Sequence, residues 1–247
     1  MTSTTHAYSS SGAQYFMQGF TLIKQKGLRR FVLIPLSVNL ILFSFAFYYV
    51  VQQLEYYMTM IESALPEFLS WLSAVLWPIA ILFILFTFSF IFSSVANWLA
   101  APFNGLLSEK VESMLTKTAP PAGGFSDILK DIPRTLSREW CKFRYYLPKA
   151  LGFFILYWII PVVGQIIWFL FLAWMMAIQY KDYPFDNHKI NFDEMRAALK
   201  EKQKLSYSFG ITAAFFSMVP LVNMIVMPVA ICGATALWVE HYRDEYV

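Results

Sequence analysis

The chain contains four long stretches without any charged residue. They cover residues 31–53, 68–108, 150–180 and 205–239, which together make up more than half of the 247 residues. A helix needs about 20 predominantly apolar residues to cross the hydrocarbon core of a bilayer. These stretches therefore predict an all-α integral membrane protein.

The composition supports this fold class. Hydrophobic residues make up 58% of the chain and charged residues 14%, whereas a soluble protein has about 45–50% and about 25%. The many Phe, Tyr and Trp residues suit lipid-facing surfaces and the membrane interface, so membrane lipid is an expected partner. The net charge of +3 is too small to indicate a nucleic acid or another polyanion as partner.

The first two stretches predict two long transmembrane helices, over residues 31–57 and 69–100. Pro35 falls near the start of the first, where its missing N–H group costs least. The second stretch is longer than one crossing needs. We therefore expect a tilted helix that projects beyond the membrane and breaks at Ala100-Ala101-Pro102.

Each of the other two stretches has a proline near its middle, Pro161 in one and Pro220 in the other. Glycines upstream of the prolines, Gly152 and Gly210, give the two stretches the form of a weak internal repeat. A kinked transmembrane helix is one interpretation, because proline is tolerated in membrane helices. The other is a helical hairpin that enters the bilayer part-way and returns to the same side.

The distribution of Lys and Arg distinguishes these interpretations. Four precede the first span, none lies in 58–67, eight lie in 110–149, six lie in 181–204, and Arg243 is in the tail. Basic segments are retained in the cytoplasm, so both termini are expected there. A single crossing by the third stretch would place the six cations of 181–204 outside. Two hemi-penetrating hairpins keep them inside and are the favoured interpretation.

We therefore expect a single membrane domain over residues 1–247. Near its start, apolar residues such as Tyr15, Phe16 and Phe20 alternate with polar ones, a pattern typical of an interfacial amphipathic helix. The expected parts are that interfacial helix (1–30), span 1 (31–57), span 2 (69–100), a cytoplasmic amphipathic helical segment (103–148), hairpin 1 (149–180), a cytoplasmic segment (181–204) and hairpin 2 (205–239).

The segment Gly27-Leu28-Arg29-Arg30, at the expected start of span 1, is a candidate anion-binding motif. A helix N-terminus presents unpaired N–H groups and a partial positive charge, and glycine lets the backbone curl around an anion. The adjacent arginines add fork-shaped donors that suit a tetrahedral oxyanion. The alternative is that Arg29 and Arg30 only anchor the cytoplasmic end of the helix, and the motif alone favours that alternative.

Polar residues within the apolar stretches are candidates for lining a hydrated path. Intramembrane polar groups are costly and often functional, although asparagine also commonly joins helices by hydrogen bonds. Glu109 lies one helical turn from Glu112, and a solvated helix face is the favoured interpretation of that pair. The candidate pathway-lining residues are Asn39, Asn97, Asn104 and Glu109, with Gln165 and Asn223 as further polar positions.

Signals for catalysis are weak. His6, His188 and His241 match no zinc spacing, so no metal is expected. The sequence has no Gly-x-Ser-x-Gly motif, P-loop or dinucleotide fingerprint, so no cofactor and no enzyme activity are expected. Residues 182–188 are expected to form a turn that ends one helix and leads into the next near Asn191.

Several runs resemble the CysZ family of bacterial sulfate permeases. They are residues 96–107 (Ala-Asn-Trp-Leu-Ala-Ala-Pro-Phe-Asn-Gly-Leu-Leu), 178–180 with 182–188, 227–230 with 232–236, and Arg29-Arg30-Phe31 followed by Pro35 and Asn39. The resemblance extends from about residue 17 to the tail. It implies two long spanning helices with hemi-penetrating hairpins, assembly into homo-oligomers, and a sulfate-binding role for Gly27, Leu28, Arg29 and Arg30.

The resemblance also implies a multi-pass protein of the bacterial inner membrane. Such a protein brings sulfate into the cytoplasm for cysteine biosynthesis, as a channel or facilitator. A non-transporting membrane scaffold for sulfate-assimilation proteins is the alternative. An intramembrane enzyme is disfavoured, because none of the four stretches holds a carboxylate or a histidine.

Overall fold

The computed structural model of the chain describes residues 11–69, 71–118 and 125–247. The regular structure of this part is entirely helical, which confirms the predicted all-α class. In chain order the elements are α1 (Gly12–Leu22), α2 (Arg29–Ala64), the short 3₁₀ helix η1 (Glu67–Leu69), α3 (Trp71–Thr116), α4 (Phe125–Ile159), α5 (Val163–Asn187), α6 (Phe192–Glu201), α7 (Gln203–Ser217), α8 (Pro220–His241) and α9 (Arg243–Tyr246).

The chain divides into two compact units. Leu33–Ala101 forms one, and Met1–Val32 together with Pro102–Val247 forms the other. We call them the long-helix unit and the helical-core unit. Each long helix, α2 and α3, begins in one unit and ends in the other.

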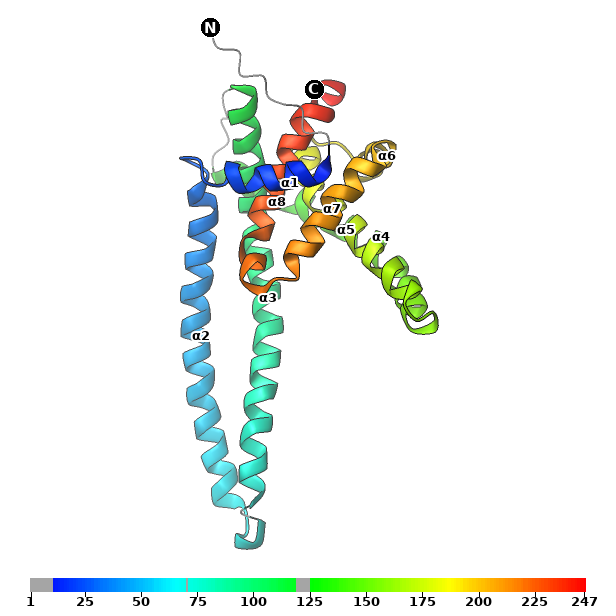
Figure 1. Ribbon diagram of the computed structural model, residues 1–247. Helices are drawn as coiled ribbons and strands as arrows, with labels where there is room; N and C mark the ends of the chain where they lie inside the picture. Colours follow the sequence, from blue (N-terminus) through cyan, green and yellow to red (C-terminus); the bar gives the residue numbers. More distant parts are fainter. Residues whose placement is uncertain (1–10, 70, 119–124) are drawn as a thin grey trace. The chain divides into compact units, whose positions relative to one another are not determined.

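The long-helix unit is an antiparallel pair of helices. In Figure 1, α2 and α3 run side by side and are joined through η1. Near this connection, the indole Nε1 of Trp77 donates to Glu62 Oε1 at 3.0 Å. Large apolar side chains cover the outside of the pair; for example, Phe45 is 73% exposed and Phe86 is 76% exposed. The 36 residues of α2 extend over roughly 54 Å at about 1.5 Å per residue, more than the roughly 30 Å of a bilayer core.

The predicted break at Ala100-Ala101-Pro102 is wrong. Helix α3 continues without interruption through these residues to Thr116. Proline removes one backbone hydrogen bond and crowds the preceding turn, but helices in this chain tolerate it repeatedly. Pro148 lies inside α4, Pro184 inside α5 and Pro228 inside α8.

The helical-core unit contains two pairs of helices joined by short turns. Helices α4 and α5 are connected through Ile160–Val162, and α7 and α8 through Met218 and Val219. Pro220 occupies the first turn of α8, where its fixed φ and missing N–H group fit the helix. The chain thus changes direction at both prolines that the sequence singled out.

Helix α1 is packed against protein. Figure 1 shows it crossing α7 and α8 within the helical-core unit. Tyr15 and Phe16 are fully buried, and the Phe16 ring lies 5.9 Å from that of Phe209 and 5.3 Å from that of Phe216. The apolar side that was expected to face the membrane interface is therefore largely covered by the second helix pair. Of the expected N-terminal helix, residues 1–10 lie outside the described part.

The expected cytoplasmic segment 103–148 has different helix boundaries in the structure. The segment 103–148 contains the end of α3 and most of α4, and α4 runs on past residue 148 to Ile159. Residues 119–124 of this segment lie outside the described part.

The turn expected at 182–188 is also wrong, because α5 stays helical to Asn187. Ion pairs explain the extra turns: Arg138 on α4 pairs with Asp182, and Arg134 pairs with Asp186. The turn comes later, and Asn191 caps α6 by accepting a hydrogen bond from the backbone N–H of Glu194 at 2.9 Å.

One helix of the described residues is long and apolar enough to cross a membrane, by length and composition. It is α5, Val163–Asn187. The statement does not extend to α2 and α3, because the side chains at several of their positions lie outside the described part. Much of the C-terminal half of α5 is buried within the protein, whereas Val163 and Ile166 near its start are more than half exposed.

Candidate anion-binding site

The candidate anion site is the link between α1 and α2. After α1 the backbone makes two turns, in which Gln25 N donates to Leu22 O at 2.9 Å and Leu28 N donates to Gln25 O at 3.2 Å. Gly27 has a φ of +97°, a conformation that residues with a side chain rarely adopt. A Cβ built at Gly27 would meet nothing within 4 Å. The glycine is therefore required by backbone geometry and not by crowding.

Leu28 and the two arginines face different surroundings. Leu28 is fully buried in the core of the helical-core unit, whereas Arg29 and Arg30 are exposed. Burial of Leu28 fixes the point where α2 begins. The arginines are thereby held at the first turn of the helix, outside the core.

The Arg29 side chain folds back toward the preceding turn. Its Nε donates to the backbone oxygen of Lys24 at 2.7 Å. Because this bond uses only Nε, it orients the guanidinium group without involving the two terminal amines. A planar guanidinium in a fixed orientation can present these amines as paired donors to an oxyanion.

The electrostatics of this link favour an anion. Lys24, Lys26, Arg29 and Arg30 are all exposed, and the first turn of α2 contains no acidic residue. The N-terminus of α2 adds its own partial positive charge and unpaired N–H groups. Four cations and a helix N-terminus thus occupy seven consecutive residues, an arrangement able to bind a tetrahedral oxyanion.

The candidate pathway residues are distributed over both units. Asn39 and Asn97 belong to the long-helix unit, and their side chains lie outside the described part. Asn104 is buried, and its amide donates to Tyr183 Oη at 3.2 Å and to Met227 Sδ at 3.3 Å. These bonds join α3 to α5 and α8, as expected of an asparagine that holds helices together. Glu109 is half-buried.

Glu112 was expected on a solvated helix face, and this expectation is wrong. Its side chain is buried, both carboxylate oxygens lie 2.9 Å from His188 Nε2, and Arg243 Nε donates to Oε1 at 3.1 Å. Burial acts to raise the pKa of Glu112, but hydrogen bonds from His188, Arg243 and Trp238 and the charge of His188 outweigh it and hold the pKa below its usual value. Glu112 thereby links α3 to the C-terminal end of α5 and to α9.

A second buried charge cluster joins α4 to α5. Arg138 and Lys142 share the carboxylate of Asp182, and Lys142 also pairs with Glu139 at 2.5 Å. Burial acts to lower the pKa of Lys142, but the negative charges of Asp182 and Glu139 outweigh it and raise that pKa. This cluster was not predicted from the sequence. The acidic residue at the C-terminal edge of the third apolar stretch was its only signal.

Lys181 is the most deeply buried cation of the described part, with 1% of its surface exposed. Its ammonium donates to Ser206 Oγ at 3.0 Å and lies 5.8 Å from the Phe209 ring centroid and 5.9 Å from that of Tyr242. Aromatic faces attract a cation.

Within the described residues, no group of three or more His, Cys, Asp and Glu side chains could hold a metal ion.

Comparison with protein families gives a match that covers most of the chain. The family model described as sulfate transporter CysZ/etoposide-induced protein 2.4 matches residues 15–228. The chain therefore belongs to this family, as its sequence runs indicated.

Proposed function

We propose that this member of the CysZ family is a sulfate permease, which carries sulfate across the bacterial inner membrane into the cytoplasm. Sulfate assimilation and cysteine biosynthesis would use the imported sulfate. The family description, a sulfate transporter, supports this proposal. The observation that carries it is the link before α2, where buried Leu28 holds two exposed arginines at the N-terminus of a 36-residue helix.

In this proposal sulfate binds at Gly27–Arg30. Backbone N–H groups of the first turn of α2 and the guanidinium groups of Arg29 and Arg30 donate to its oxygens. Asn39, Asn97, Asn104 and Glu109 are proposed to line its path. Of these, Asn104 has its amide engaged with Tyr183 and Met227, so it would contribute its side-chain oxygen.

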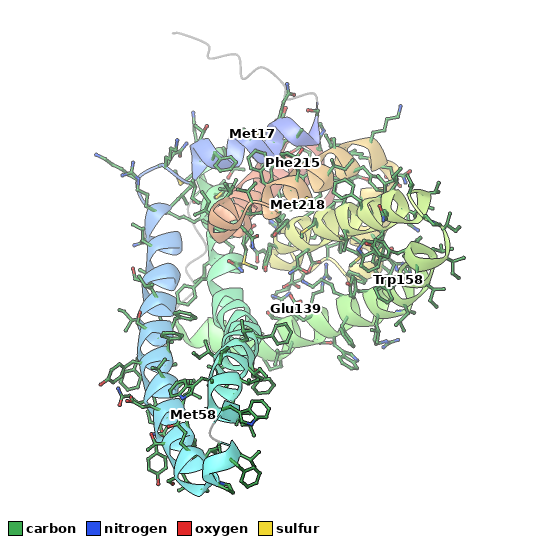
Figure 2. The ribbon with its side chains drawn as sticks, turned by 60° about the horizontal axis from the view of Figure 1, so that its bottom comes forward. Met17, Met58, Glu139, Trp158, Phe215 and Met218 are labelled. Carbon is green, nitrogen blue, oxygen red and sulfur yellow. The ribbon has the colours of Figure 1, made fainter. Side chains whose placement is uncertain are left out.

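The proposed topology has α2 and α3 spanning the bilayer and the two helix pairs entering part-way. Large exposed apolar side chains at the turns support it. Trp158 is 71% exposed beside the α4–α5 turn, and Phe215 and Met218 are each 62% exposed at the α7–α8 turn (Figure 2). The 15 residues of α7 extend over roughly 22 Å at about 1.5 Å per residue, too short for a full crossing.

This topology places both termini and the basic segments in the cytoplasm, by the positive-inside rule. The exposed apolar surfaces of the long-helix unit suit either lipid or a second protomer. We therefore propose a homo-oligomer in which several protomers contribute helices to the path. Such a path makes the protein a channel or facilitator and not a pump.

Energetics constrain how such a permease works. Moving a dianion inward against a negative-inside potential costs roughly 4–5 kcal/mol per 100 mV, at about 2.3 kcal/mol per charge. Net inward flow therefore requires a higher sulfate concentration outside than inside, a coupled ion or rapid consumption of sulfate in the cytoplasm.

Uptake of radiolabelled sulfate into proteoliposomes tests the proposal. The wild-type protein should give uptake well above that of empty vesicles, and the Arg29→Gln/Arg30→Gln variant should lose at least about tenfold, because hydrogen bonds from charged groups contribute about 1.5–3 kcal/mol each. The matched control is Lys117→Gln/Lys189→Gln, which removes two exposed charges elsewhere.

Absence of uptake by the wild type would reject the permease. Sulfate-dependent growth that survives charge reversal at both arginines would favour the scaffold.

A further inference from the structure

A groove of about 480 Å³ lies between α4, α5 and the segment from α6 to α7. It belongs wholly to the helical-core unit and is separate from the Gly27–Arg30 link. Its lining has two chemically different halves. One half contains Tyr145, Lys149 and Lys200, and the other contains Phe153, Ile167 and Leu170.

The polar half is built around the ring of Tyr145. The Lys149 ammonium lies 3.8 Å from the ring centroid, and the Arg196 guanidinium lies 4.5 Å from it. Trp174 Nε1 donates to Tyr145 Oη at 3.2 Å, which fixes the ring in place. Lys200 follows Arg196 one helical turn later on α6. Three cations therefore gather at this end, and Asp193 is paired with Arg196 at 3.0 Å.

The apolar half continues into an exposed apolar surface. Phe153 and Ile167 come from the two helices of the α4–α5 pair, and the same pair exposes Phe154 (49%), Trp158 (71%) and Ile166 (56%) toward its turn. These are the side chains that the proposed topology places in lipid. The groove therefore leads from a cationic end, at the cytoplasmic border of hairpin 1, toward the hydrocarbon.

We propose that this groove binds one anionic phospholipid. The lipid phosphate lies between Lys149 and Lys200, and an acyl chain follows Phe153, Ile167 and Leu170. Basic pockets between membrane helices on the cytoplasmic side are suited to anionic headgroups. A small inorganic anion would leave the apolar half of the lining unused, and a zwitterionic lipid would leave the cations uncompensated. The assignment rests on the proposed membrane position of hairpin 1 and is independent of sulfate binding.

Native mass spectrometry of the full-length protein in detergent measures this binding directly. Phosphatidylglycerol and phosphatidylcholine of equal chain length are titrated separately, and the bound lipid is counted. The wild type should bind one phosphatidylglycerol more tightly than phosphatidylcholine. The Lys149→Gln/Lys200→Gln variant should lose this binding by roughly 30-fold, because each cation near a lipid surface contributes a factor of about five.

Three comparisons make the test decisive. Lys149→Arg/Lys200→Arg should retain the affinity, and Lys117→Gln/Lys189→Gln, which removes two exposed charges outside the groove, should leave it unchanged. Inorganic phosphate and tail-less glycerophosphoglycerol should fail to displace the lipid at equal concentration. Equal binding of both lipids, unchanged binding by the Gln variant, or displacement by inorganic phosphate would each overturn the proposal. Sulfate uptake can fail while this lipid binds, so the two proposals are separable.

Discussion

Arg138 on α4 donates two hydrogen bonds to one carboxylate oxygen of Asp182 on α5, from Nε at 2.9 Å and from Nη2 at 2.7 Å. Lys142 lies 3.2 Å from the other oxygen. All three side chains are less than a tenth exposed. Two buried cations thus share one buried carboxylate, and the α4–α5 pair is held together at its polar end by charge.

Replacing Asp182 should therefore destabilise the protein strongly. Asp182→Asn leaves two buried cations without their shared counter-charge, and breaking a buried pair in this way costs about 3–5 kcal/mol. Chemical denaturation in detergent micelles measures the loss. Asp193→Asn is the control, since its carboxylate is 83% exposed in the pair with Arg196 and such pairs contribute at most about 1 kcal/mol. Equal losses for both variants would contradict this account.

The two glycines of the weak internal repeat should respond differently to substitution. A Cβ at Gly210 would lie 1.9 Å from the backbone oxygen of Ala173 on α5, whereas a Cβ at Gly152 would meet nothing within 4 Å. Gly210→Ala should destabilise by about 1–3 kcal/mol or more, because α7 must move away from α5. Gly152→Ala should be neutral or stabilise the helix by up to about 1 kcal/mol. Denaturation midpoints of the two variants that fall in the opposite order would refute the packing role of Gly210.

The helix pairs could be predicted from the sequence, whereas the helix ends could not. The signals for the two turns were Pro161 and Pro220, each near the middle of a charge-free stretch. Pro102 and Pro184 carry the same local signal, yet α3 and α5 continue through them. Near Pro184, the backbone stays helical because Asp182 and Asp186 are paired with arginines of α4. The helix-breaking tendency of proline is a local property, so it takes no account of partners on another helix.

The anion-binding role of Gly27–Arg30 stays a prediction, and the sequence could indicate only part of the geometry of that link. The residue types at Gly27–Arg30 indicated an anion, but the burial of Leu28, which positions the arginines, depends on the tertiary core. Glu112 was misjudged for a similar reason. Its partners are 76 and 131 residues away in the chain, so the neighbouring sequence gave no sign that it would be buried and paired.

Substitution of Gly27 tests the backbone requirement of the anion site. Gly27→Ala imposes a cost of about 1–2 kcal/mol, because the observed φ of +97° disfavours any residue with a Cβ. The link should then relax and displace Arg29, so sulfate uptake should fall by roughly 5- to 30-fold. Since a Cβ there meets nothing within 4 Å, a steric clash cannot account for the loss. Gly152→Ala should retain full uptake, and unchanged uptake by Gly27→Ala would show that this conformation is dispensable.

Acid should weaken the protein partly through Glu112. Its pKa is lower in the folded protein than the value of about 4.3 for an unperturbed Glu, so protonation favours the unfolded chain. The stabilisation is complete above about pH 4.3 and is lost as the pH falls through the lower folded pKa. Glu112→Gln should lower stability at neutral pH and flatten its decline below about pH 4.3. The exposed Glu201→Gln should retain the wild-type decline; a Glu112→Gln curve parallel to the wild type would exclude this contribution.

Accessibility of single cysteines distinguishes a hairpin from a kinked span at the α4–α5 pair. With Cys141→Ser and Cys232→Ala as background, Ser63→Cys reports on the segment 58–67, at the end of α2, and Lys189→Cys reports on the segment 181–204. Both positions are exposed, so either thiol can react if the reagent reaches it. A membrane-impermeant maleimide should label Ser63→Cys in intact spheroplasts and Lys189→Cys only after permeabilisation, because two crossings return the chain to the cytoplasm and the hairpin adds none. Labelling of Lys189→Cys in intact spheroplasts would mean that the third apolar stretch crosses the membrane completely. The six cations of 181–204 would then lie outside, against the charge rule on which the hairpin assignment depends.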